Sequence, residues 1–313
     1  MIYPNPGNLL TNISHLHSCT NFQVSVNGTN CFVYESENYW TNGTEASVAR
    51  RPQDKVAFTS FGLTNTVAAV VVTFAKKITN AVVRPSGAGI IPVINSNKLS
   101  FSISQPTKIS VEVNSNNLPL FIIAETPEVP DTNATYYYGP GVYQIGTKKV
   151  VNKNESVYIA GGAVVEGTFD CTGTNVSFRG RGILTCGSVT ADQWLADNSL
   201  CPINYWTFAP KYQTFDGIFM VNSPGWNIYG EIGLSTVRNV KMISWVGRSD
   251  GIHLGGDSLL EDCLYFINDD CLIGNHGNNN TFRNCVIWRG FWGHAIIALT
   301  QVGSAATTNC LWD

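Results

Sequence analysis

The sequence is poor in charge and lacks long apolar runs. Only 13% of its 313 residues are charged, the formal net charge is −3, and lysine and arginine form no cluster. A weakly acidic chain without a basic patch is poorly suited to binding nucleic acid or an anionic membrane surface. The longest apolar run, residues 67–72, is far below the ~20 residues that a membrane span needs and predicts a buried strand. We therefore expect neither nucleic acid nor a membrane as a partner, and we expect a monomer.

Helical and metal-binding patterns are also missing. No segment keeps apolar residues at the i, i+3, i+4, i+7 spacing between helix caps, which argues against a helical architecture. No CxxC pair and no cysteine–histidine spacing fits a zinc site, so neither a metal nor another cofactor is expected.

The C-terminal half instead contains a weak repeat of β-like units. Each unit has an asparagine or aspartate followed by alternating apolar residues, the period-two pattern of a strand. Aligned on that polar residue, at positions 239, 262, 284 and 309, the units are 23, 22 and 25 residues apart. Short β-rich repeats of this length predict a solenoid, and specifically a right-handed parallel β-helix whose coils stack at the strand spacing of ~4.8 Å.

The first part of the chain has a different pattern. Residues 20–125 contain short β-like runs between polar turns, which predict a small antiparallel β-sandwich. These runs cover residues 22–26, 68–74, 81–84, 108–113 and 118–124. We therefore expect an all-β chain with an N-terminal sandwich domain (1–125), a Pro-rich linker (126–134) and a parallel β-helix (135–313) that ends without a cap. A loop over 188–212, carrying Trp194 and Trp206, is expected either to form one rim of a binding groove or simply to cover an open coil.

The nine cysteines are odd in number, so they cannot all pair within the chain. The disulfide candidates are Cys19 with Cys31, and Cys171 with Cys186 or Cys201. Three others share one repeat position and are expected to stack as small buried side chains: Cys263, Cys285 and Cys310.

Asn-X-Ser/Thr sequons occur at Asn12, Asn27, Asn42, Asn133, Asn154, Asn175 and Asn279. Together with the cysteines they favour secretion, although the first residues lack the basic start and apolar core of a signal peptide.

Three aspartates fall at intervals of about one coil. Asp250 precedes the adjacent pair Asp269 and Asp270 by 19 and 20 residues, and His294 follows Asp270 by 24. Stacked coils would bring these side chains into one patch, where like charges raise the pKa of at least one carboxyl group. A held proton beside a free carboxylate is what general acid/base catalysis requires. The alternative is a ladder of polar residues at solenoid turns without chemistry.

Several motifs, in their order along the chain, resemble polysaccharide hydrolases of the pectinase-like β-helix group. They lie at residues 180–184 (GRGIL), 222–228 (NSPGWNI), 249–251 (SDG), 268–271 (NDDC) and 292–296 (WGHAI). The SDG, DDC and GH elements resemble the polygalacturonase family. The preceding sandwich, the NDD triplet and VIWR at 286–289 resemble more closely the dextranase/isopullulanase family.

The resemblance implies an inverting glycoside hydrolase without a cofactor, acting on a polysaccharide. Asp269 would protonate the glycosidic oxygen, and Asp250 with Asp270 would deprotonate the attacking water. Inversion requires carboxyl groups ~6.5–9.5 Å apart. The candidate substrate-binding residues are His294, Arg248, His253 and Trp292.

Two departures from the polygalacturonases are visible. Ala295 follows the histidine where those enzymes have glycine, and the Arg-Ile-Lys motif that binds the substrate carboxylate is absent before the chain ends at Asp313. We therefore expect a neutral α-glucan as the substrate and a solenoid cut short at its C-terminal end. The alternatives are a polygalacturonase-like pectin hydrolase, a lyase with Arg248 as its base, and a carbohydrate-binding β-helix without catalysis.

Overall fold

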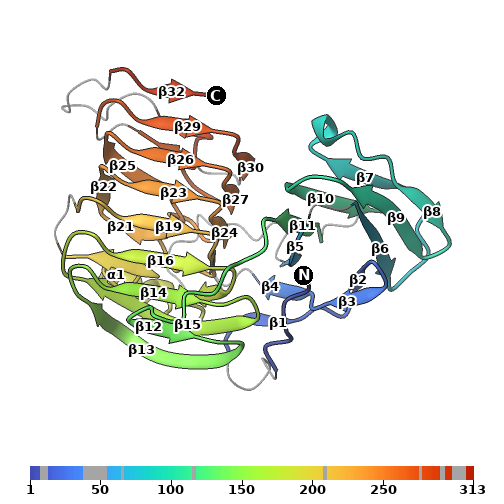
Figure 1. The fold of residues 1–313 in the computed structure, drawn as a ribbon, viewed down its shortest axis with the longest axis horizontal. Helices are drawn as coiled ribbons and strands as arrows, with labels where there is room; N and C mark the ends of the chain where they lie inside the picture. Colours follow the sequence, from blue (N-terminus) through green and yellow to red (C-terminus); the bar gives the residue numbers. More distant parts are fainter. Residues whose placement is uncertain are drawn as a thin grey trace. The chain divides into compact units, whose positions relative to one another are not determined.

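The computed structural model describes residues 1–7, 13–37, 55–64, 67–114, 118–206, 210–274, 277–289, 293–297 and 308–313. These residues form two compact units, one within residues 1–129 and the other within 130–313. Figure 1 shows both units. No helix in the described part of the chain has the length and apolar character needed to cross a membrane.

The first unit is a β-sandwich. One sheet has the order β1-β4-β5-β11-β10-β7, and the other has the order β3-β2-β6-β9-β8. All neighbours pair antiparallel except β5 and β11, which are parallel. The strands are β1 (Leu16–Ser18), β2 (Phe22–Val26), β3 (Thr29–Cys31), β4 (Tyr34–Glu37), β5 (Lys55–Gly62), β6 (Ala68–Phe74), β7 (Ala81–Arg84), β8 (Val93–Asn95), β9 (Lys98–Ile103), β10 (Thr107–Val113) and β11 (Leu120–Glu125), with the 3-10 helix η1 (Ser86–Ala88) after β7.

Alternation along these strands places every second residue in the core between the two sheets. In β6, for example, Ala68, Val70, Val72 and Phe74 are buried while the residues between them are half-buried or exposed. The strands predicted at 22–26, 68–74 and 81–84 are present with those bounds.

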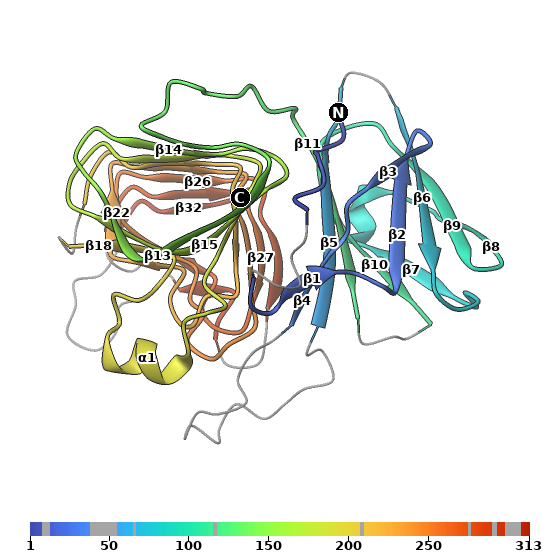
Figure 2. The ribbon, with the colours of Figure 1, turned by 90° about the horizontal axis from the view of Figure 1, so that it is seen from below.

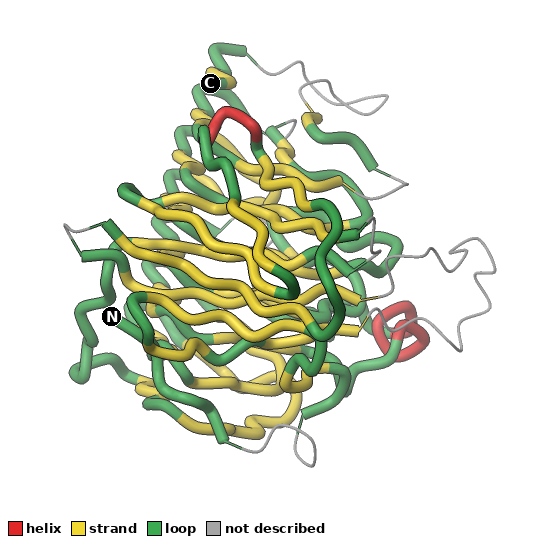
Figure 3. The backbone as a smooth tube through the Cα atoms, turned by 90° about the vertical axis from the view of Figure 1, so that its right-hand side faces the viewer, coloured by secondary structure: helices red, strands yellow, loops and turns green. Residues whose placement is uncertain are grey.

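The second unit is a parallel β-solenoid. One sheet has the order β12-β14-β16-β19-β23-β26-β29-β32, a second contains β21-β18-β15-β17-β20-β24-β27-β30 with β13 beside β15, and a third has the order β22-β25-β28-β31. Figure 2 views the solenoid nearly end-on, so that strands of successive coils superimpose, and Figure 3 colours the strands of both units by secondary structure.

The bounds are β12 (Tyr136–Tyr138), β13 (Gly141–Val151), β14 (Ser156–Ile159), β15 (Ala163–Cys171), β16 (Ser177–Gly180), β17 (Ile183–Thr185), α1 (Ala191–Ala196), β18 (Ile203–Tyr205), β19 (Thr214–Asp216), β20 (Phe219–Val221), β21 (Ile228–Tyr229), β22 (Glu231–Gly233), β23 (Thr236–Arg238), β24 (Lys241–Ser244), β25 (Ile252–Gly256), β26 (Leu259–Glu261), β27 (Leu264–Ile267), β28 (Leu272–Ile273), β29 (Thr281–Arg283), β30 (Val286–Arg289), β31 (Ile296–Ile297) and β32 (Leu311–Trp312). The predicted fold class, a parallel β-helix preceded by an antiparallel sandwich, is thus confirmed, with the parallel β5–β11 pair as an addition.

The repeating polar residue turns the chain at the end of each strand of the first solenoid sheet. Asn239, Asp262 and Asn284 have φ values of 52°, 56° and 51°, a left-handed conformation that asparagine and aspartate adopt more readily than other side chains. The Asn284 amide also donates to the Asp262 carboxylate one coil away. The repeat therefore reflects a steric requirement of the turn.

The fourth predicted unit was aligned incorrectly. Leu311 pairs with Thr281 and Trp312 with Phe282, so the last step is 30 residues rather than 25. Asn309 accordingly continues a second ladder, in which its amide donates to Asn279 at 3.3 Å. Cys310 therefore does not share a column with Cys263 and Cys285.

The disulfides expected from the sequence are absent. All nine cysteines are in the described part of the chain, and all are free thiols. Cys171, Cys186 and Cys201 are fully buried, and burial is the main cause that raises the pKa of each thiol. They therefore act as small core side chains.

The described residues of the segment 188–212 form more regular structure than the predicted loop. It contains α1, which begins with a capping box: Gln193 N–H donates to Thr190 Oγ1 at 3.2 Å, and Thr190 N–H donates to Gln193 Oε1 at 2.8 Å. It also contributes β18, which pairs with β15 and β21. The Thr-x-x-Gln spacing was the sequence signal for this helix.

Candidate active site

The three aspartates lie in equivalent turns of neighbouring coils. Each turn joins a strand of the second solenoid sheet to a strand of the third. Asp250 lies between β24 and β25, Asp269 and Asp270 lie between β27 and β28, and His294 lies between β30 and β31. Because β24, β27 and β30 pair in register, the turns that follow them stack on one another.

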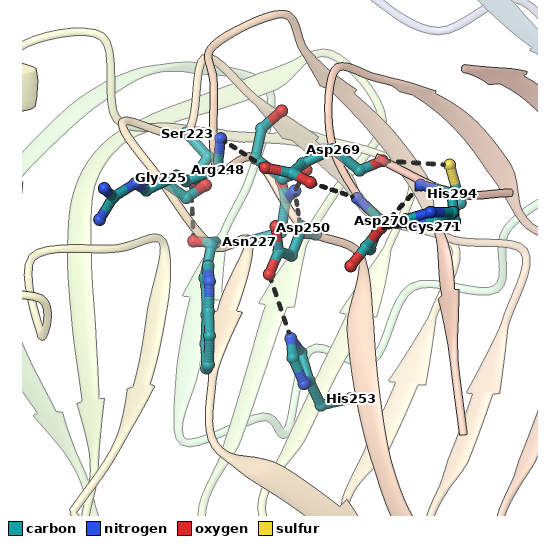
Figure 4. Close-up of polar contacts among 12 residues, drawn as sticks. Ser223, Gly225, Asn227, Arg248, Asp250, His253, Asp269, Asp270, Cys271 and His294 are labelled. Carbon is teal, nitrogen blue, oxygen red and sulfur yellow. Dashed lines mark hydrogen bonds and ion pairs between the residues drawn. The ribbon is translucent and has the colours of Figure 1, made fainter. Parts of the chain in front are cut away.

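Backbone hydrogen bonds hold these turns together. Gly251 N–H donates to the carbonyl of Asp270 at 2.7 Å, and Cys271 N–H donates to the carbonyl of His294 at 2.9 Å. The one-coil spacing inferred from the sequence is therefore the spacing in the structure. Figure 4 shows the three aspartates with His294 and His253 around them.

Two glycines permit this close stacking. A Cβ atom at Gly293 would overlap the backbone of Asp269 and Asp270, and a Cβ atom at Gly251 would overlap the carbonyl oxygen of Cys271. Any side chain at either position would push neighbouring coils apart, and the carboxyl groups with them.

Asp269 is held in place by two backbone donors. Its Oδ2 accepts from Arg248 N–H at 2.9 Å, and its Oδ1 accepts from Asp270 N–H at 3.0 Å. Burial, followed by the charges of Asp250 and Asp270, raises the pKa of Asp269 to about 6, against the opposing effect of the two N–H donors. The carboxyl group therefore retains a proton in weakly acidic solution.

Asp250 is the most buried of the three acids. It is 9% exposed, and its backbone carbonyl accepts from the side chain of Asn227 at 2.8 Å. Burial and, second, the charge of Asp270 raise the pKa of Asp250 to about 7, while the Arg248 charge acts in the opposite direction.

Asp270 faces His294. Its Oδ1 accepts from the His294 backbone N–H at 2.6 Å and lies 3.0 Å from Nδ1 of the same residue. The imidazole is 70% exposed and the Asp270 side chain 27% exposed. Both hydrogen bonds go to one carboxylate oxygen, which fixes the orientation of the group and directs the other oxygen elsewhere.

His253 is a second histidine at the site, and it contacts Asp250. Its Nε2 is 3.5 Å from Asp250 Oδ2, and its ring stacks on Trp226 with centroids 4.3 Å apart. Burial lowers the pKa of His253 to about 4, so the ring is neutral at the pH values at which the aspartates titrate. Trp226 and Asn227 belong to the NSPGWNI motif, but sequence reasoning gave them no role.

The remaining candidates differ in position. Arg248 is exposed. It adopts a left-handed conformation, with φ at 60°, and donates its backbone N–H to Asp269. Trp292 lies outside the described residues. Within the described chain, no group of three or more histidine, cysteine, aspartate or glutamate residues has a geometry for binding a metal ion.

Comparisons with known proteins point to the same fold. Dex49A from Penicillium minioluteum matches with a TM-score of 0.68 at 17% sequence identity, over 90% of this chain and 68% of that one. A putative glycosyl hydrolase from Parabacteroides merdae matches with a TM-score of 0.38 at 14% identity, over 49% of this chain and 81% of that one, and is too distant to carry an argument.

No protein-family model matches the chain, and neither does any curated protein. The match to Dex49A confirms the predicted likeness to the pectinase-like β-helix proteins at the level of the fold.

Proposed function

We propose that this chain is a glycoside hydrolase that cleaves a polysaccharide with inversion at the anomeric carbon. The observation that carries the proposal is the stacking of three carboxyl groups in adjacent turns, with the pKa of Asp250 and of Asp269 raised to about 7 and about 6. Carboxyl groups that hold protons near neutral pH suit the acid and base steps of glycoside hydrolysis.

In this mechanism Asp269 is the general acid. Its protonated form donates to the glycosidic oxygen as the bond to the leaving sugar breaks. Asp250 and Asp270 hold a water molecule on the opposite face of the sugar and accept its proton as its oxygen attacks the anomeric carbon. Because His294 contacts Asp270 through Oδ1, the second oxygen of that carboxylate is the one that we assign to the water.

The active form requires a proton on Asp269 and an ionised Asp250. Because the pKa of Asp250, about 7, lies above that of Asp269, about 6, Asp250 holds the proton in most molecules, and the active form is a minority species that is most populated between these two values. Neutral His253 adds no positive charge that would favour ionisation of all three acids at once.

An α-glucan is the substrate class that we propose. The support is the sequence resemblance to the dextranase/isopullulanase family, together with the shared fold of the dextranase Dex49A. Action on an external polymer implies secretion. The asparagines of the five sequons within the described residues are all exposed, as attachment of glycans in a secretory pathway requires.

The test compares the parent chain with Asp269→Asn on dextran, pullulan and polygalacturonate, with new reducing ends as the readout. We expect reducing ends from an α-glucan and a rate lowered by at least 10²-fold in the variant, the scale of a missing general acid. Asp192→Asn, an exposed carboxyl group in α1, is the control and keeps the parent rate.

Three outcomes bear on the proposal. Polygalacturonate as the cleaved polymer would replace the α-glucan assignment with a pectin hydrolase. No cleavage of any polymer, or an unchanged rate in Asp269→Asn, would refute the mechanism. Anomeric signals in proton NMR of the first product test inversion separately.

A further inference from the structure

Trp206 is an exposed aromatic residue whose orientation is fixed by a buried acid. Its side chain is 69% exposed, yet its indole Nε1–H donates to Asp170 Oδ2 at 3.0 Å. Asp170 is 4% exposed, and its other oxygen accepts from the Asn204 amide at 3.0 Å. A buried carboxylate that accepts from both side chains leaves the flat face of the indole presented to solvent in a defined orientation.

Strand alternation explains why these groups face outward. Tyr205, between Asn204 and Trp206, is 2% exposed and belongs to the solenoid core. Its two neighbours therefore point away from the core, and of these Trp206 is exposed while Asn204 is covered beside Asp170. A tryptophan this exposed contributes little to the core, and its flat face is available to a ligand.

The outer surface continues from Trp206 to the aspartates. Asp170 pairs with Asn204 in the next coil, and Asn204 pairs with Tyr229 in the coil after that. The Tyr229 ring lies 5.2 Å from Trp226, and Trp226 stacks on His253, which is 3.5 Å from Asp250. Aromatic and polar side chains thus form a continuous track along the solenoid axis.

The length of this track indicates the size of its ligand. Trp206 lies two coils from the coil of Asp250, which at ~4.8 Å per coil is about 10 Å along the axis. That is longer than one sugar ring. Flat aromatic faces bind the apolar faces of sugars, and Trp226 and Tyr229, both partly exposed, continue the track from Trp206 toward Asp250.

We infer that Trp206, positioned by Asp170, is a distal carbohydrate-binding subsite that holds a polysaccharide chain along the solenoid axis toward Asp250. The inference rests on the proposed function for the identity of the ligand. Asp170 acts as a positioning residue, because it contacts the indole rather than the sugar.

The experiment is affinity electrophoresis in native gels containing dextran, pullulan or polygalacturonate, with every chain carrying Asp269→Asn to prevent cleavage. We expect at least one gel to retard the parent, and Trp206→Ala to weaken binding about tenfold, the equivalent of ~1.4 kcal/mol. Trp206→Phe keeps a flat ring and is expected to retain part of the binding. Tyr137→Ala, which removes an exposed aromatic from the first solenoid sheet, is the control and migrates like the parent.

Asp170→Asn tests the positioning role. It keeps the shape of the side chain but replaces one of the two accepting oxygens with an NH2 donor, so either the indole or the Asn204 amide loses its acceptor. Binding is therefore expected between that of the parent and that of Trp206→Ala, with thermal unfolding that remains cooperative. Retardation of Trp206→Ala equal to that of the parent would overturn the subsite. So would a parent chain that no polymer retards. Reducing-end assays on chains with Asp269 intact distinguish failure of the subsite from failure of the hydrolase proposal. If the chain cleaves a polymer and Trp206→Ala does not change the rate, only the subsite is refuted.

Discussion

Replacement of Asp250 by asparagine should stabilise the solenoid while it removes activity. Asp250 is 9% exposed, and its folded pKa is about 7 against an ordinary value of 3.8. Between these two values the folded chain binds a proton that the unfolded chain has released. The free energy of unfolding therefore falls as pH rises through this interval, and the whole loss is reached above the folded pKa.

The magnitude follows from the shift. A difference of about 3 pKa units corresponds to about 4 kcal/mol at 1.36 kcal/mol per unit. The asparagine side chain resembles the protonated acid in shape and charge, so the variant avoids this cost. We expect the stability difference between the variant and the parent to grow by up to about 4 kcal/mol from about pH 4 to about pH 8, at roughly 1.4 kcal/mol per pH unit.

Urea denaturation monitored by tryptophan fluorescence measures this difference in the relevant unit, since seven of the eight tryptophans lie beyond residue 190. Asp192→Asn removes a carboxylate that is already in water and should show no such growth with pH. The stability difference between Asp250→Asn and the parent could instead stay constant over the interval or shrink as pH rises. Either result would refute the claim that burial destabilises the ionised form of this carboxyl group.

Three further predictions concern the same turns. The pH profile of kcat/KM should be a narrow bell with limbs near 6 and 7, because Asp269 must be protonated and Asp250 ionised; a rate that is flat from about pH 5 to about pH 8 would contradict it. Gly293→Ala should lower kcat at least tenfold and destabilise the fold by roughly 1–3 kcal/mol, because the added methyl group overlaps the Asp269 backbone. Thermal unfolding and rate assays measure both effects. The matched control is Gly87→Ala, whose methyl group meets nothing within 4 Å. His294→Ala should lower kcat by roughly tenfold, the scale of one lost hydrogen bond to a charged group, because Asp270 keeps only the backbone donor; equal kcat values would exclude an orienting role for the imidazole.

The sequence predicted the solenoid because its repeat has a local cause. Asparagine or aspartate tolerates the left-handed turn after each strand, and alternation follows from one buried face, so both leave a visible pattern. The same pattern misled at the last coil. Asn284-Cys285 and Asn309-Cys310 look equivalent, but the final coil is longer, and Asn309 pairs with Asn279 instead.

The approach of the aspartates could also be predicted, because it depends only on coil length. The partners of Asp250 could not. The His253–Trp226 stack is a side-chain contact between neighbouring coils, which no spacing reveals. Nor did the sequence show that Asp170 would hold Trp206, since that contact joins β15 to a segment 36 residues later.

Carbon-13 NMR of the carboxyl groups across a pH titration tests the central claim most directly, namely that three acids crowd into one site where Asp250 and Asp269 hold protons near neutral pH. The account predicts that Asp250 titrates at about 7 and Asp269 at about 6, and that Asp250→Asn lowers the pKa of Asp269 by removing a neighbouring charge. Titration of both groups near the ordinary value of 3.8 would show that neither burial nor neighbouring charge acts on them, and would contradict the proposed chemistry.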